Sequence, residues 1–125
     1  MLVLDANYIL RYLLKDNEGM FIEAKAVIEL EYCLILNEVL AEVVYVLSGV
    51  YEVPKAVIVD TLSELLMLDN LSLHEDKKYI LNALQIYQSK NIDFVDCCLC
   101  ALSDKYMIKT FDKKLQKCMQ TNNVL

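Results

Sequence analysis

The chain alternates between short apolar runs and longer stretches in which apolar residues recur every three or four positions. The longer stretches predict helices, because this spacing places the apolar side chains on one face. The short runs are too brief for a helix and are typical of buried strands. Strands are therefore predicted at 1–5, 33–36, 71–73 and 107–111, with a further edge-strand candidate at 122–125.

Helices are predicted between these strands, and residues suited to helix starts lie near several of their beginnings. Asn7, Asn37 and Asp93 can act as N-caps, since short polar side chains accept hydrogen bonds from the first backbone N–H groups. Pro54 suits a first helical turn, and Gly49 suits a helix end. The predicted helices span 7–14, 20–31, 37–49, 54–68, 74–90, 93–106 and 112–120.

Strands that alternate with helices indicate an α/β fold with a parallel sheet covered on both faces. A chain of 125 residues is near the common size of one domain. It contains no internal repeat, low-complexity tract or convincing linker. We therefore predict a single domain over residues 1–125.

The composition supports a helix-rich globular protein. The chain is 57% hydrophobic and has only two glycines and one proline, which argues against disorder and against a β-sandwich. No segment approaches the roughly 18 apolar residues of a membrane span. Asp5 interrupts the apolar start, so a signal peptide is not expected, and the predicted location is cytoplasmic.

Five cysteines are present, and three of them crowd the segment 97–100. This pattern favours reduced thiols in a protein interior over a disulfide framework. A zinc site is a weaker alternative, because the crowded cysteines lack the paired Cys-x-x-Cys spacing of zinc knuckles.

The net charge of −6 argues against a protein that coats nucleic acid through bulk attraction. An acidic protein can still act on nucleic acid if a metal ion and a local basic patch provide the contacts. Charge alone therefore leaves the partner open.

Four acidic residues stand out by their position. Ligands of open parallel sheets bind beyond the carboxyl ends of the strands, and Asp5 and Asp112 end the first and fourth predicted strands. Glu42 and Asp96 lie within otherwise apolar helical segments, where an unpaired charge is expected to be costly. Four carboxylates around one crevice would raise each other's pKa values.

A divalent metal ion would remove this repulsion, and Mg²⁺ and Mn²⁺ prefer carboxylate oxygens and water as ligands. Such an ion can activate a bound water and stabilise charge on a phosphoryl oxygen. Structural roles remain open for individual residues. Asp112 and Asp93 can cap helices, and Asp5 can hydrogen-bond the turn that follows it.

Four blocks of the sequence, in order, resemble PIN-domain nucleases, and more narrowly the VapC-like toxins of toxin–antitoxin pairs. The blocks are LVLDANYILRYLL, NEVLAEVVYVL, DFVDCCLCALS and IKTFDKKLQK, which together cover nearly the whole chain. The resemblance implies a three-layer α/β/α fold. Its central parallel sheet is expected to have four to five strands in the order 3-2-1-4-5, flanked by about seven helices.

The same resemblance implies a metal-dependent endoribonuclease. Asp5, Glu42, Asp96 and Asp112 would surround one or two Mg²⁺ or Mn²⁺ ions and act in catalysis. The supporting residues would be Asn7, Thr110 and Asp93. Expected partners are RNA, a second copy of the chain in a homodimer, and an antitoxin whose tail enters the acidic site. Ala6 departs from the threonine or serine of many members.

Contacts to RNA are predicted from the basic residues near these acids. Lys109 and Lys113 flank Asp112, and Arg11 lies one helical turn beyond Asn7. Phosphate contacts by the lysines and an ordinary solvated helix face are about equally compatible with this pattern.

Other functions fit less well. A haloacid-dehalogenase-type phosphatase needs a second aspartate two residues after the first, where this chain has Asn7. A receiver domain needs an acidic pair that is missing. A housekeeping RNA-processing nuclease of the same family and a catalytically silent PIN fold remain as alternatives.

Overall fold

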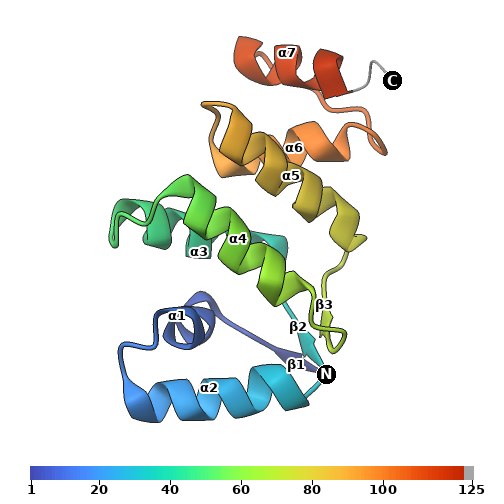
Figure 1. Ribbon diagram of the computed structural model, residues 1–125. Helices are drawn as coiled ribbons and strands as arrows, with labels where there is room; N and C mark the ends of the chain where they lie inside the picture. Colours follow the sequence, from blue (N-terminus) through green and yellow to red (C-terminus); the bar gives the residue numbers. More distant parts are fainter. Residues whose placement is uncertain (123–125) are drawn as a thin grey trace. The chain divides into compact units, whose positions relative to one another are not determined.

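The computed structural model describes residues 1–122 (Figure 1). The chain divides into two compact units, Met1–Glu75 and Asp76–Leu125. The single domain over residues 1–125 stays a prediction.

The first unit contains a small parallel sheet. Its strands are β1 (Leu2–Val3), β2 (Cys33–Leu34) and β3 (Leu71–Ser72), in the order β1-β2-β3. Leu2 lies opposite Cys33 and Cys33 opposite Leu71, so the three strands run in register. This order agrees with the 3-2-1 part of the predicted sheet.

Four helices accompany these strands: α1 (Ala6–Leu14), α2 (Glu18–Leu30), α3 (Asn37–Gly49) and α4 (Lys55–Leu66). Helix α1 packs against both α2 and α3, and α3 also packs against α4 (Figure 1). Fully buried side chains at Ile9, Ile28, Ile35, Val43 and Ile58 come from four helices and the β2 segment. The apolar stripes read from the sequence therefore form the core of this unit.

The second unit is helical within the described residues. It comprises α5 (Lys77–Ser89), α6 (Phe94–Leu102) and α7 (Lys113–Asn122). Helix α6 packs against both α5 and α7. Phe94 is 1% exposed and meets Tyr87 edge-to-face, with ring centroids 5.7 Å apart, so this aromatic pair joins α5 to α6.

The sheet has three strands, and the predicted four to five was wrong for residues 1–122. Residues 107–111 have no regular structure. A strand needs a neighbour to pair its backbone groups, and this unit offers none among its described residues. Most of the candidate edge strand 122–125 lies outside the described residues, and Asn122 itself ends α7.

Two predicted caps were misplaced by one or two residues. Helix α1 is capped by Asp5, whose Oδ1 accepts a hydrogen bond from the backbone N–H of Tyr8 at 2.8 Å. Asn7 instead lies inside the first turn of α1. Leu36 occupies the N-cap position of α3 without a side-chain bond, and Asn37 is the first helical residue.

A disulfide bond joins Cys100 of α6 to Cys118 of α7, with Cα atoms 6.0 Å apart. The expectation of fully reduced cysteines was therefore wrong for this pair. Both residues are buried, at 0% and 2% exposure. The fold, rather than cysteine crowding in the sequence, brings them together.

No helix among residues 1–122 is long and apolar enough to cross a membrane. The longest helices have 13 residues.

The Phe94–Tyr87 contact leads to a stability prediction. Phe94→Ala is expected to lower the free energy of unfolding by about 3–5 kcal/mol, because it removes a buried ring and leaves a cavity. The matched control is Val95→Ala, since Val95 is the next residue and is 42% exposed. Urea unfolding measures both variants. Equal losses in the two would contradict a core role for Phe94.

Candidate active site

Asp5 lies where the predicted strand-end acid was expected, directly beyond β1. Leu4 continues the strand pairing, its N–H donating to the carbonyl of Leu34 at 3.2 Å. The next residue is exposed Asp5, whose Oδ1 is used in capping α1. Its Oδ2 accepts no hydrogen bond within residues 1–122, so this oxygen is available to a cation.

Glu42 lies in the second turn of α3 and is exposed to solvent. Its neighbours Ala41 and Val43 are buried, at 8% and 0% exposure. The argument that an apolar surrounding would make this charge costly was therefore wrong, because Glu42 is on the solvent face of α3. Its assignment as a metal ligand now depends on family resemblance and on its position after β2.

Asn37 is a polar residue at the same sheet edge as Asp5 that the sequence indicated only as a cap. It follows β2, as Asp5 follows β1, and parallel pairing puts both strand ends at one edge. The Oδ1 atom of Asn37 is buried and accepts no hydrogen bond within the described part of the chain. Such orphaned acceptors are uncommon in folded proteins. We add Asn37 to the candidate residues of this edge.

Asp96 is in the first turn of α6 and is half-buried. Burial raises the pKa of Asp96, and the negative charges of Asp112 and Asp93 raise that pKa further. Asp96 therefore feels the charges of both neighbouring carboxylates. The predicted crowding of Asp5, Glu42, Asp96 and Asp112 around one crevice stays a prediction. Asp93 occupies the N-cap position of α6, although its side chain accepts no capping hydrogen bond.

Asp112 is fixed by a local hydrogen-bond network at the start of α7. Its Oδ1 accepts from the N–H of Leu115 at 2.8 Å, and its own N–H donates to Thr110 Oγ1 at 3.0 Å. Gln116 Nε2 donates to the carbonyl oxygen of Thr110 at 2.8 Å. The expected supporting residue Thr110 thus holds the backbone of Asp112. Capping and ligation are compatible, since Asp112 Oδ2 remains outside these bonds.

The predicted acids divide between the two units. Asp5 and Glu42 belong to Met1–Glu75, whereas Asp93, Asp96 and Asp112 belong to Asp76–Leu125. Within residues 1–122, no group of three or more His, Cys, Asp or Glu side chains lies close enough to hold a metal ion. The structure therefore brings acids together within a unit without forming a complete ligand set.

Arg11 is engaged inside its own unit. Its Nη1 atom forms an ion pair with Asp16 at 2.7 Å, and its Nη2 donates to the hydroxyl of Tyr51 at 3.4 Å. Asn7, the other expected residue of this helix, is exposed one turn away. The role of Arg11 in binding substrate stays a prediction.

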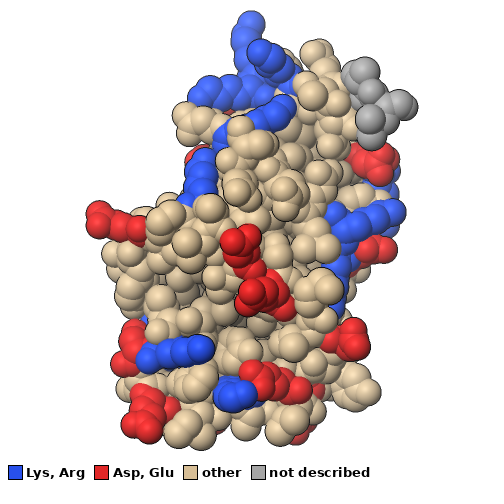
Figure 2. Space-filling model, in the orientation of Figure 1, with Lys and Arg blue, Asp and Glu red and all other residues tan. Residues whose placement is uncertain are grey.

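Basic side chains concentrate in the second unit. Residues 76–125 contain eight lysines and five aspartates, a formal charge of +3, whereas residues 1–75 have a formal charge of −9. Lys109 and Lys113, predicted to contact RNA, are both exposed beside Asp112. Figure 2 shows several basic side chains over α7, at the top of the view. This local charge can attract phosphate even though the whole chain is acidic.

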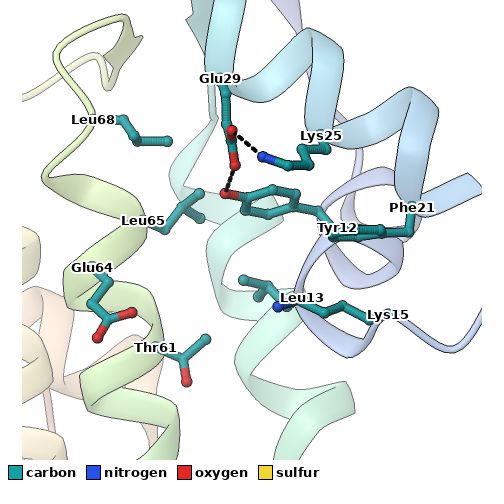
Figure 3. Close-up of a pocket in the computed structure, with 10 residues that line it drawn as sticks. All are labelled: Tyr12, Leu13, Lys15, Phe21, Lys25, Glu29, Thr61, Glu64, Leu65 and Leu68. Carbon is teal, nitrogen blue, oxygen red and sulfur yellow. Dashed lines mark hydrogen bonds and ion pairs between the residues drawn. The ribbon is translucent and has the colours of Figure 1, made fainter.

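The first unit also contains a cavity of about 490 Å³. It is lined by α1, α2 and α4, and Tyr12 donates a hydrogen bond to Glu29 inside it at 2.7 Å (Figure 3). Burial and this bond raise the pKa of Tyr12 to about 12, so the hydroxyl remains a donor at neutral pH. None of the predicted site residues lines this cavity.

Comparison with known families settles the relationship. The PIN domain family matches residues 2–118, a range that spans both units and contains every predicted site residue. The chain belongs to the PIN domain family. No curated protein and no solved structure matches the chain. Membership supports a nuclease-type function.

PIN-domain nucleases usually depend on divalent metal ions, and the residues present fit such an ion chemically. Asp96 is a partly desolvated carboxyl beside two further acids, an environment that a cation would relieve. Asp5 and Asp112 each keep one carboxylate oxygen outside their capping bonds. Hard oxygen donors of this kind suit Mg²⁺ or Mn²⁺.

The capping bond of Asp5 allows its structural and chemical roles to be separated. Asp5→Ala is expected to destabilise the protein by about 1 kcal/mol, because the N–H of Tyr8 loses its acceptor. Asp5→Asn keeps an oxygen acceptor. Its free energy of unfolding is expected to lie within about a few tenths of a kcal/mol of the wild-type value. Thermal unfolding without metal compares the two. A large loss in Asp5→Asn would show that its charge stabilises the fold.

The raised pKa of Asp96 predicts a pH-dependent stability. Unfolded aspartate has a pKa of about 3.9. Because the folded pKa is higher, ionised Asp96 destabilises the fold above that value, and this cost disappears below about pH 3.9. Asp96→Asn is therefore expected to raise the melting temperature at pH 7 in EDTA, with a smaller gain at pH 4.

The control for this measurement is Asp104→Asn, which changes an exposed aspartate just beyond α6. A gain for Asp96→Asn that is equal at both pH values would contradict the electrostatic explanation.

Proposed function

We propose that this PIN-domain protein is a metal-dependent endoribonuclease that hydrolyses RNA phosphodiester bonds. The observation that supports it most directly is the raised pKa of Asp96 beside Asp112 and Asp93, in a chain matched to the PIN family over residues 2–118. Perturbed carboxyl groups are typical of catalytic sites.

The metal ligands in this proposal are Asp5, Glu42, Asp96 and Asp112. A bound Mg²⁺ or Mn²⁺ would supply an activated water and would stabilise negative charge on the phosphoryl oxygen. The chain itself contributes orientation. Capping bonds fix Asp5 at the start of α1 and Asp112 at the start of α7.

RNA is the proposed substrate because exposed basic residues lie beside a proposed metal ligand, where they could contact the phosphates of its backbone. Lys109 and Lys113 flank Asp112 on exposed positions. They can contact phosphates and hold the strand beside the acids, without selecting a sequence. Arg11 can contribute only if its pairing with Asp16 is exchanged for a phosphate.

We further propose that the enzyme is the toxin of a toxin–antitoxin pair, that it forms a homodimer, and that an antitoxin inhibits it in the cytoplasm. These proposals rest on the resemblance of the four sequence blocks to VapC-like toxins. A small adjacent gene encoding a DNA-binding protein would support them. A gene located alone among RNA-processing genes would favour a housekeeping nuclease.

Two other functions receive less support. A silent PIN fold has no positive observation, since all four expected acids are present. A phosphatase of the haloacid-dehalogenase type lacks its second aspartate, because Asn7 occupies that position.

RNA cleavage by the purified chain tests the proposal. We expect cleavage of single-stranded RNA with Mg²⁺ or Mn²⁺ and none with EDTA. Asp5→Asn and Asp96→Asn are each expected to reduce the cleavage rate at least about 100-fold. Losing a group that only orients a metal ligand costs up to about 100-fold, and losing a ligand itself should cost at least as much. Internal labelling distinguishes endonucleolytic products.

Glu38→Gln provides the matched control, since Glu38 is an exposed acid one turn before Glu42 on α3. It is expected to keep the wild-type rate. Cleavage that survives in both Asn variants, or in EDTA, would contradict the assignment.

A further inference from the structure

The disulfide Cys100–Cys118 connects the two helices that present the acids of the second unit. Asp96 lies four residues before Cys100 on α6, so the two side chains project from the same face one turn apart. Asp112 caps the helix that carries Cys118. A covalent bond between the helices therefore constrains Asp112 relative to Asp96.

Besides the disulfide, helix α7 is held by a small number of buried side chains and by hydrogen bonds at its far end. Its buried side chains within the described residues are Leu115 and Cys118, and most of its remaining positions are exposed. At its far end, Asn122 Nδ2 donates to the carbonyl of Cys100 at 3.2 Å. The Oδ1 atom of Asn122 also accepts a hydrogen bond from Asn82 Nδ2 of α5 at 3.3 Å. The disulfide is thus the covalent link in an attachment that otherwise depends on Leu115 and Asn122.

The length of α7 makes this dependence stronger. The helix has ten residues, and isolated helices shorter than about 12–15 residues are marginal in water. Segments with few buried apolar contacts also open at low free-energy cost. Reduction of the disulfide therefore leaves a helix that can detach locally while α5 and α6 stay packed through Phe94 and Tyr87.

We propose that the Cys100–Cys118 pair is a redox control of the candidate site, in which oxidation fixes α7 and its Asp112 beside α6, and reduction releases them. The control of cleavage rests on the proposed function, whereas the release of α7 does not. The acting reagents are disulfides such as oxidised glutathione and dithiols such as dithiothreitol.

The reduction balances as a thiol–disulfide exchange. One thiolate of the dithiol attacks a cysteine sulfur, breaks the protein S–S bond and forms a mixed disulfide. Its second thiolate then attacks that mixed disulfide and releases the second cysteine. The protein gains two electrons and two protons, and the reagent becomes a cyclic disulfide. Because both cysteines are buried, α7 must open locally before attack.

Thiol counting tests the first step. The chain has five cysteines, so the unreduced, denatured protein should show three thiols, and the reduced protein five. Peptide mapping should assign the bond to Cys100 and Cys118. Five thiols in protein purified and refolded with oxidised glutathione would overturn the proposal.

Hydrogen exchange tests the release of α7. Reduction by dithiothreitol is expected to speed exchange in peptides covering 113–122 by about 100-fold, the stabilisation expected for a disulfide closing a loop of this size. Exchange in α5 should remain unchanged. Cys118→Ser should show the fast exchange without reductant, whereas Cys98→Ser, which changes a free thiol on α6, should behave as wild type. Equal exchange in both redox states would overturn the proposal.

Mn²⁺ affinity and RNA cleavage test the control of the site. Both are expected to fall about tenfold when the wild-type protein is reduced. This is the change expected if reduction lowers the fraction of molecules with α7 in place about tenfold. Cys118→Ser should be insensitive to reductant. Unchanged Mn²⁺ affinity in the reduced protein would overturn the control. A redox-dependent Mn²⁺ affinity without any RNA cleavage would instead refute only the nuclease assignment.

Discussion

The repulsion that neighbouring carboxylates exert on Asp96 is the constraint on which the candidate site depends. Asp93, Asp96 and Asp112 share one region of the second unit, and partial burial of Asp96 adds to the cost of its charge. Within this group, Asp112 also serves as a helix cap, and the backbone N–H that it accepts offsets part of the repulsion. In the other unit, Asp5 caps α1 in the same way. On the proposed function, the same side chains would serve both as caps and as metal ligands.

The two units of the chain carry formal charges of opposite sign. The first 75 residues are strongly acidic, whereas the remainder is basic despite its three crowded acids. An overall charge of −6 hides this difference. A polyanionic substrate would be attracted to the lysines around α7 and would meet the carboxylates there only with a cation present. The composition of the whole chain thus hides a local basic charge that could attract a polyanion.

Local signals predicted much of the fold. All seven predicted helices occur, because apolar spacing and end signals act within a single segment. The strand expected at 107–111 was wrong, since strand formation depends on a partner that the segment does not reveal. The disulfide was also missed, because Cys100 and Cys118 meet only through packing of α6 on α7. The exposure of Glu42 was also missed. Its apolar neighbours in the sequence suggest burial, but they lie on the other faces of α3.

The capping role of Asp5 has a consequence for the gene. Aspartate and asparagine codons differ at a single nucleotide, and asparagine caps helices about as well as aspartate. One base change at this position can therefore remove a proposed metal ligand while leaving α1 intact. On the proposed function, a folded but inactive variant of this chain lies one base change away. Such a variant would lose the proposed activity without losing its fold.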